Sequence, residues 1–132
     1  MKAEYPEFTL FWEEGVTSSR MVGECLGEEL THTPSGAPCV PGYSVSLSDT
    51  CGYVFLAVTQ KNRRIGVDAE DMRRTPPKGF KDIREWTDAE AYCKAIGKNL
   101  FSLIREGAPQ TEFFRTEIEG MAVSVWVEEE IR

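Results

Sequence analysis

Residues 43–59 read YSVSLSDTCGYVFLAVT, and this stretch decides the fold class. Tyr43, Val45 and Leu47 alternate with serines, which is the period of a half-buried strand over Tyr43–Ser48. After a turn sequence at Asp49–Gly52, the apolar run Tyr53–Thr59 is typical of a buried strand. Two such runs across a short glycine-containing turn predict an antiparallel hairpin.

Strand-like and helix-like segments alternate on both sides of this hairpin. Helical spacing of apolar residues predicts a helix over Ser18–Leu30, with Ser18 or Ser19 as its N-cap. The prolines and glycines of Thr31–Gly42 predict a loop. The other predicted strands are Phe8–Trp12, Ile65–Glu70, Glu112–Ile118 and Met121–Val127, the last two joined by the turn Glu119-Gly120. The periodicities therefore predict an α+β domain.

The clearest helical pattern opens at Thr87. Thr87-Asp88-Ala89-Glu90 fits a capping box, in which the threonine and the glutamate satisfy each other's exposed amides. Gly97 is placed where it would bend or split the helix. The apolar stripe that continues this helix comprises Tyr92, Ala95, Ile96, Leu100, Leu103 and Ile104.

Length and composition indicate one globular domain over residues 1–132, because 41% of the residues are hydrophobic and 28% are charged. The apolar runs are far shorter than the ~20 residues of a membrane-spanning helix, and the first residues lack a signal-peptide pattern. We therefore expect a cytoplasmic protein with no membrane partner. The four cysteines form no CxxC and His32 is the only histidine, so we expect free, mostly buried thiols and no zinc site.

The net charge is −7, yet residues 61–84 contain eight basic and four acidic residues. This window therefore carries +4 while the remainder carries −11. An acidic chain repels nucleic acid, so we expect no nucleic-acid partner. The basic window suits a phosphate or an acidic protein, and a solvated basic loop is the alternative.

Two acidic clusters are the candidates for chemistry. In Gly66-Val67-Asp68-Ala69-Glu70, the strand period places Asp68 and Glu70 on one face, where their carboxylates repel unless a cation such as Mg²⁺ lies between them. Further on, Glu90 and Lys94 share a helix face at i,i+4 spacing. Each cluster also has a plain structural explanation, as an exposed strand edge or as a surface ion pair.

Taken together, these segments resemble the 4′-phosphopantetheinyl transferase superfamily. Gly66-x-Asp68-x-Glu70 is similar to its GxDxE strand, and Trp86-Thr87-x-x-Glu90-Ala91-x-x-Lys94-Ala95-x-Gly97-x-x-Leu100 is similar to its W[ST]xKE[AS]xxKxxGxGL helix. Gly36-Ala37-Pro38 and Ser46-Leu47-Ser48-Asp49 are similar to its GxP and SxSH elements. The resemblance spans residues 36–100, about half the chain, with four weak motifs in the family's order.

The resemblance implies Mg²⁺-dependent transfer of 4′-phosphopantetheine from coenzyme A to a serine of an acyl or peptidyl carrier protein. The metal ligands would be Asp68, Glu70 and Glu90, and the catalytic residues Glu90 and Lys94. Coenzyme A would contact Pro38, Ser48, Asp49 and Lys94. The family fold is an antiparallel sheet packed against a long helix. Larger members resemble two fused copies, so a single 132-residue unit implies a homodimer or homotrimer.

Three departures remove cations that the family uses. Asp49 replaces its histidine, Ala89 its helix lysine and Ala37 the lysine often found in GxP, while Asn99 replaces a glycine. At ~1.5–3 kcal/mol for each charge-assisted hydrogen bond, these losses would weaken coenzyme A binding. Two alternatives therefore stand beside the enzyme. One is a family relic that binds coenzyme A or a carrier protein without transfer, and the other is a structural subunit of a larger synthase.

Overall fold

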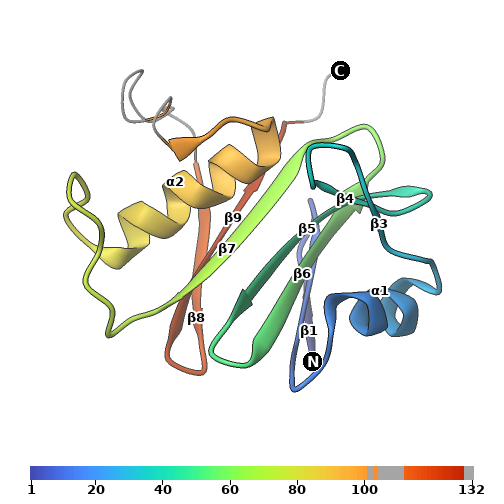
Figure 1. Ribbon diagram of the computed structural model, residues 1–132, viewed down its shortest axis with the longest axis horizontal. Helices are drawn as coiled ribbons and strands as arrows, with labels where there is room; N and C mark the ends of the chain where they lie inside the picture. The colour runs from blue at the N-terminus through green and yellow to red at the C-terminus, as the bar shows by residue number, and fades with distance from the viewer. Residues whose placement is uncertain (101–102, 104–111, 130–132) are drawn as a thin grey trace.

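The computed structural model describes residues 1–100, 103 and 112–129, and it confirms an α+β architecture with antiparallel sheets and two helices (Figure 1). One sheet has the strand order β1-β2-β6-β5 and a second has the order β7-β9-β8, while β3 and β4 form a small ladder of their own. The helices are α1 (Ser18–Leu26) and α2 (Ile83–Ile96). The strands are β1 (Lys2–Glu4), β2 (Thr9–Glu14), β3 (Thr31–His32), β4 (Pro38–Cys39), β5 (Tyr43–Thr50), β6 (Tyr53–Gln60), β7 (Ile65–Asp71), β8 (Phe114–Ile118) and β9 (Met121–Val127).

The main core lies between the two larger sheets. Alternate residues of β6 and β7, such as Phe55 and Val67, are fully buried in it. The opposite face of β6 packs Leu56 against Met21 and Val22 of α1. On the other side of the molecule, α2 covers the outer face of β7 and β9 (Figure 1). The period of two along each strand therefore divides the apolar side chains between a shared core and two helix-covered faces.

A seam between β5 and β7 joins the two sheets. The hydroxyl of Ser46 accepts a hydrogen bond from the Val67 amide at 3.0 Å, and that of Ser48 accepts one from the Ala69 amide at 3.1 Å. The partner residue number rises by two in both strands, so β5 and β7 run in the same direction. Ser46 and Ser48 of the predicted alternating strand thus face this seam, where their hydroxyls take the place of backbone acceptors.

Both predicted hairpins are confirmed. Thr50 pairs with Tyr53 and Ile118 pairs with Met121, so each loop has two residues. The first loop, Cys51-Gly52, has φ values of 51° and 79°, and the second, Glu119-Gly120, has values of 50° and 77°. Two successive positive φ angles suit the twist of a tight hairpin, and glycine at the second position adopts them without strain.

The predicted start of the second helix is wrong. The N-cap is Asp82, whose side chain accepts from the Glu85 amide at 2.8 Å, and Thr87 lies inside the helix. The Thr87 hydroxyl bonds to the Arg84 carbonyl and to Ser124, so it is not free to cap. Gly97 ends α2 with φ 72°, which a glycine adopts readily. Leu100 and Leu103 are helical again beyond it, and Ile104 lies outside the described residues.

The first helix is also shorter than predicted. Its N-cap is Thr17, and it ends at Leu26 because Gly27 adopts a left-handed conformation. The predicted loop Thr31–Gly42 contains the short strands β3 and β4, and the N-terminal strand β1 was not predicted from the sequence.

Two features fix α2 against the sheet. A Cβ atom on Gly66 would lie 1.8 Å from the Ala91 carbonyl oxygen, so the helix backbone rests directly on this glycine. Nearby, the carboxylate of Asp88 accepts from Ser124 Oγ at 2.6 Å and pairs with the Arg115 guanidinium. These contacts set the register of α2 over β7 and β9.

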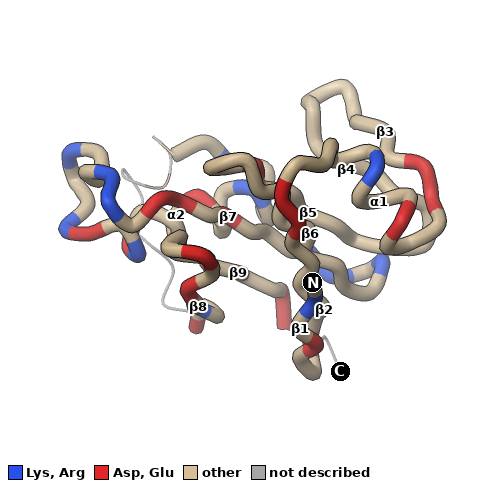
Figure 2. The backbone as a smooth tube through the Cα atoms, turned by 90° about the horizontal axis from the view of Figure 1, so that it is seen from below, with Lys and Arg blue, Asp and Glu red and all other residues tan. Residues whose placement is uncertain are grey.

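Charge is unevenly placed along the molecule. Figure 2 shows basic segments gathered in the loop that joins β7 to α2, at the end of the molecule away from α1. Arg73, Arg74, Lys78 and Lys81 belong to this loop. Arg84 lies in the first turn of α2, and Lys61, Arg63 and Arg64 lie at the opposite end of β7. The window is therefore two separate basic regions.

Candidate functional site

Asp68 lies in the middle of β7, on the face that α2 covers. Its side chain is 8% exposed, and Oδ1 is 3.4 Å from the ammonium of Lys94. Within the part of the chain that the structure describes, Oδ2 is buried and has no hydrogen-bond partner. Burial raises the pKa of Asp68 to about 7, Lys94 opposes this rise, and the charges of Glu70 and Glu90 add to it. Glu70 and Glu90 are therefore near enough for their charges to act on Asp68.

Lys94 closes the seam between the sheets. Its ammonium donates to the Leu47 carbonyl of β5 at 3.1 Å and to the Val67 carbonyl of β7 at 3.0 Å, besides its contact with Asp68. All three contacts are with oxygen atoms, which matches the three donors of an ammonium. Lys94 is thus a structural cation as well as a candidate ligand for phosphate.

Glu70 and Glu90 each have a separate partner. Glu70 Oε2 pairs with Arg74 Nη1 at 2.7 Å, and Glu90 Oε1 accepts from the Trp86 indole at 3.2 Å. The Arg74 guanidinium lies 4.9 Å from the centre of the Trp86 ring. One arginine and one tryptophan therefore connect the two carboxylates that were predicted as metal ligands.

The three carboxylates match Mg²⁺ in chemistry but are not gathered around a common point. Hard cations prefer carboxylate oxygens, and the unpartnered Oδ2 of Asp68 is an atom that a cation would satisfy. Among residues 1–100, 103 and 112–129, however, no group of three or more His, Cys, Asp or Glu side chains is placed to hold a metal ion. The metal site at Asp68, Glu70 and Glu90 stays a prediction that requires their present contacts to change.

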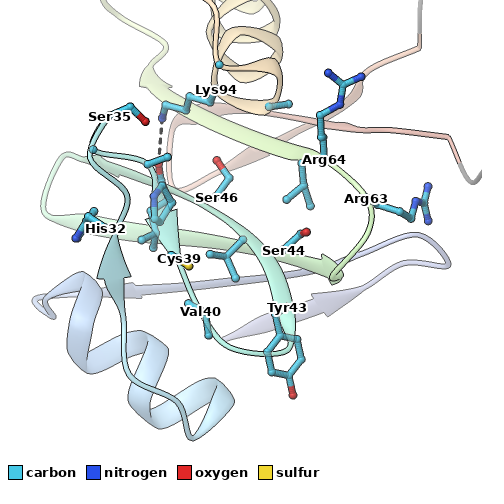
Figure 3. A pocket seen from close by; sticks show the side chains of 18 of the residues that line it. His32, Ser35, Cys39, Val40, Tyr43, Ser44, Ser46, Arg63, Arg64 and Lys94 are labelled. Atoms are coloured by element: carbon cyan, nitrogen blue, oxygen red, sulfur yellow. Dashed lines mark hydrogen bonds between the residues drawn. The ribbon is translucent and has the colours of Figure 1, made fainter.

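A groove of about 730 Å³ lies beside Lys94. Three distant segments form most of it, namely the β3–β5 region with Gly36-Ala37-Pro38, the turn after β6 and the C-terminal end of α2, and Ser18 of α1 also lines it. Figure 3 shows Lys94 reaching from α2 toward β5, with His32 and Ser35 at one side and Arg63 and Arg64 at the other. The cationic lining residues are Lys61, Arg63, Arg64 and Lys94.

The groove contains two of the four positions predicted to contact coenzyme A. Pro38 and Lys94 line it, whereas Ser48 is buried against the Ala69 amide and Asp49 is exposed on β5 away from the lining. Ser46, two residues before Ser48, lines the groove instead. Of the departures from the family pattern, Ala37 lies in the groove wall, where it offers no charge.

The basic turn after β6 is the part of the groove that motif matching missed. Ser44 Oγ donates to the Lys61 carbonyl at 2.8 Å, which holds the turn beside β5. Glu128 holds the two arginines, since its backbone carbonyl accepts from Arg63 and its carboxylate from Arg64. The signal in the sequence was the basic run itself, but sequence alone could not assign it to this groove.

The cysteines are all free, as predicted, but the expectation that most are buried is wrong. Only Cys93 is buried, while Cys39 and Cys51 are exposed and Cys25 is intermediate. Burial raises the pKa of the Cys93 thiol. Cys39 lies in the two-residue strand β4, and Cys51 lies in the two-residue loop between β5 and β6.

Comparison of this sequence with models of known protein families gives no match, and comparison with curated proteins gives none either. Within the described residues, neither helix has the length and apolar character needed to cross a membrane.

Proposed function

We propose that this protein is a phosphopantetheinyl transferase that takes its arm from coenzyme A and passes it to an acyl or peptidyl carrier protein. The observation that supports the proposal is the groove, where Gly36-Ala37-Pro38, the serine strand and the Lys94 end of α2 converge. These are the segments whose sequence resembles the family. Its basic lining suits the phosphates of coenzyme A.

The three predicted acidic ligands would act next to this groove, since Lys94 lines the groove and also contacts Asp68. Asp68, Glu70 and Glu90 would hold Mg²⁺, which when bound polarises phosphate oxygens. Glu90 would accept the proton of the carrier serine, directly or through water. Lys94, whose side chain is 35% exposed, would offset negative charge that develops on the leaving group.

A partner copy and a carrier protein belong to the same proposal. The basic loop between β7 and α2 offers a surface for an acidic carrier. A chain of this size with one set of acidic motifs would act as a homodimer or homotrimer. Neither assembly is needed for the contacts described above.

A second function, binding without transfer, is favoured by two observations. The three carboxylates have separate partners in the structure, and Asp49 lies outside the groove lining, where the family has a histidine. A protein with these features would bind coenzyme A or a carrier and leave both unchanged. If neither binding nor transfer occurred, a structural role in a larger synthase would remain.

Incubation with coenzyme A, Mg²⁺ and an apo carrier protein, followed by mass spectrometry of the carrier, separates these functions. Transfer adds one phosphopantetheine arm to the carrier and requires Mg²⁺. We expect Glu90→Gln to abolish this gain, because the amide cannot accept the serine proton, while it retains an oxygen for the Trp86 indole.

Glu85→Gln is the matched control, since Glu85 lies in the first turn of the same helix and we expect transfer to persist. Undiminished transfer by Glu90→Gln would show that the role given to Glu90 is wrong. A complex that forms without any mass gain would favour the binding function.

A further inference from the structure

Arg74 occupies a central place among the acidic side chains. It donates to Glu70 at 2.7 Å, and its guanidinium stacks on Trp86 at 4.9 Å, while the Trp86 indole donates to Glu90 at 3.2 Å. The Arg74 amide also bonds to the Asp71 carbonyl at 3.0 Å, which turns the chain back at the end of β7. A single arginine thus lies next to one carboxylate and next to the partner of another.

The acidic cluster consequently contains two cations that belong to the chain itself. Lys94 neutralises Asp68 from one side, and Arg74 neutralises Glu70 from the other. Asp68 is more than nine-tenths buried, and its Oδ2 has no hydrogen-bond partner in the described part of the chain. Neutralisation of the cluster is therefore incomplete, and the negative charges of Glu70 and Glu90 also act on Asp68.

We propose that Arg74 is an internal cation that competes with a divalent metal ion for Glu70 and thereby sets the affinity of the acidic cluster for metal. This inference rests on the proposed function, because it assumes that the metal ligands are Asp68, Glu70 and Glu90. A guanidinium that pairs with Glu70 offsets part of the carboxylate's negative charge and repels a metal ion that Glu70 ligates, so it weakens metal binding. Stacking on Trp86 gives Arg74 a second favourable contact that a metal must disrupt.

The test is Mn²⁺ binding to the full-length protein without coenzyme A, measured at pH 7.5 from the electron paramagnetic resonance signal of free Mn²⁺. Mn²⁺ is the probe because it accepts the same oxygen ligands as Mg²⁺. We expect Arg74→Ala to bind Mn²⁺ about tenfold more tightly than the wild type, or more, because a charge-assisted contact with Glu70 is gone. The double variant Arg74→Ala/Glu70→Gln should lose this gain.

Arg73→Ala is the matched control. Arg73 is the neighbouring residue with the same charge, but it pairs with Asp71 rather than Glu70. Arg73→Ala removes a positive charge that repels the metal ion from a distance, as Arg74→Ala does. Unlike Arg74→Ala, it leaves the ion pair of Glu70 with Arg74 intact. We expect a gain of about twofold or less, because exposed charges are screened.

Four results would overturn the inference: no gain in Arg74→Ala, weaker binding in Arg74→Ala, an equal gain in Arg73→Ala, or no Mn²⁺ binding by any variant. Tryptophan fluorescence gives a second readout, since Mn²⁺ should change the emission of the wild type but not that of Trp86→Phe. The mass assay on the carrier protein judges the proposed function separately, so transfer without any effect of Arg74 would reject this inference alone.

Discussion

Two buried aspartates, Asp68 and Asp88, lie on the same helix–sheet interface, and they are satisfied to very different degrees. Each residue is 6% exposed. The carboxylate of Asp88 accepts from Ser124 and pairs with Arg115 through both of its oxygens. Asp68 has one ammonium contact at 3.4 Å, and its second oxygen lacks a hydrogen-bond partner among the described residues. A satisfied buried charge fixes the fold, whereas an incompletely satisfied one marks a place where a ligand could bind.

Gly66→Ala should have the largest effect, because it would break the interface that both aspartates share. The added Cβ would lie 1.8 Å from the Ala91 carbonyl oxygen, so α2 must move away from β7. We expect a loss of about 3 kcal/mol or more in the free energy of unfolding, at or above the upper end for overpacked cores. Urea denaturation followed by circular dichroism measures it.

Gly23→Ala provides the control for Gly66→Ala. Gly23 lies within α1, and a Cβ there would meet nothing within 4 Å. We expect this variant to be unchanged or stabilised by about 0.5–1 kcal/mol, as for glycine to alanine in a helix. Equal stability of the two variants would show that α2 does not rest on Gly66.

Asp88→Ala should have the next largest effect. The Ser124 hydroxyl and the Arg115 guanidinium would lose their acceptor, and Ser124 is buried. We expect the free energy of unfolding to fall by about 2 kcal/mol, less than for a fully buried pair because half of the Arg115 side chain is exposed. Urea denaturation is again the measurement, with Glu85→Ala, at a half-buried residue in the first turn of the same helix, as the control. A loss in Asp88→Ala no larger than in the control would remove the anchoring role of Asp88.

Asp68→Asn should have a smaller effect that depends on pH. In the folded protein the pKa of Asp68 is raised to about 7, above its unfolded value, so the folded state binds the extra proton between about pH 4 and 7. The free energy of unfolding therefore falls as pH rises from about 4 to 7, because the buried carboxyl loses its proton over this range. Between pH 5 and 8, we expect the free energy of unfolding of the wild type to fall by on the order of 1 kcal/mol more than that of Asp68→Asn.

The measurement is urea denaturation at a series of pH values, in the presence of a chelator. Asp71→Asn is the contrasting variant. The Arg73 guanidinium and amide lower the pKa of Asp71 to about 2, so its contribution is present above about pH 4 and is lost only in stronger acid. Asp71→Asn should not alter how the free energy of unfolding changes between pH 5 and 8. If the free energy of unfolding changed equally with pH in the wild type and in Asp68→Asn, the raised pKa of Asp68 would be contradicted.

Local patterns allowed much of the fold to be predicted from the sequence. Both hairpins were predicted correctly because Cys51-Gly52 and Glu119-Gly120 favour tight turns, although the first turn was predicted as Asp49–Gly52 and Asp49 and Thr50 belong to β5. The start of α2 was predicted wrongly, because both Asp82 and Thr87 can cap a helix. The choice between them depends on Ser124, which binds Thr87 from 37 positions away. Two-residue strands such as β3 carry too little periodicity to be predicted.

The candidate site was predicted only in part, for similar reasons. Glu70 and Glu90 lie near enough for their charges to raise the pKa of Asp68, but the described side chains of these three residues are not gathered around one metal position. Their partners, including Arg74, come from tertiary contacts that no local pattern encodes. The basic residues 61–84 were likewise treated as one window, although the two ends of the window lie at opposite ends of β7. Of its basic residues, Lys61, Arg63 and Arg64 line the groove.

A crystal structure of the protein with coenzyme A and Mn²⁺, with the ion located by its anomalous signal, tests the central claim most directly. The proposed function predicts an ion against Oδ2 of Asp68, with Glu70 released from Arg74 and the phosphates in the groove beside Lys94. Coenzyme A in the groove with no ion at Asp68, and with Glu70 still paired to Arg74, would contradict it.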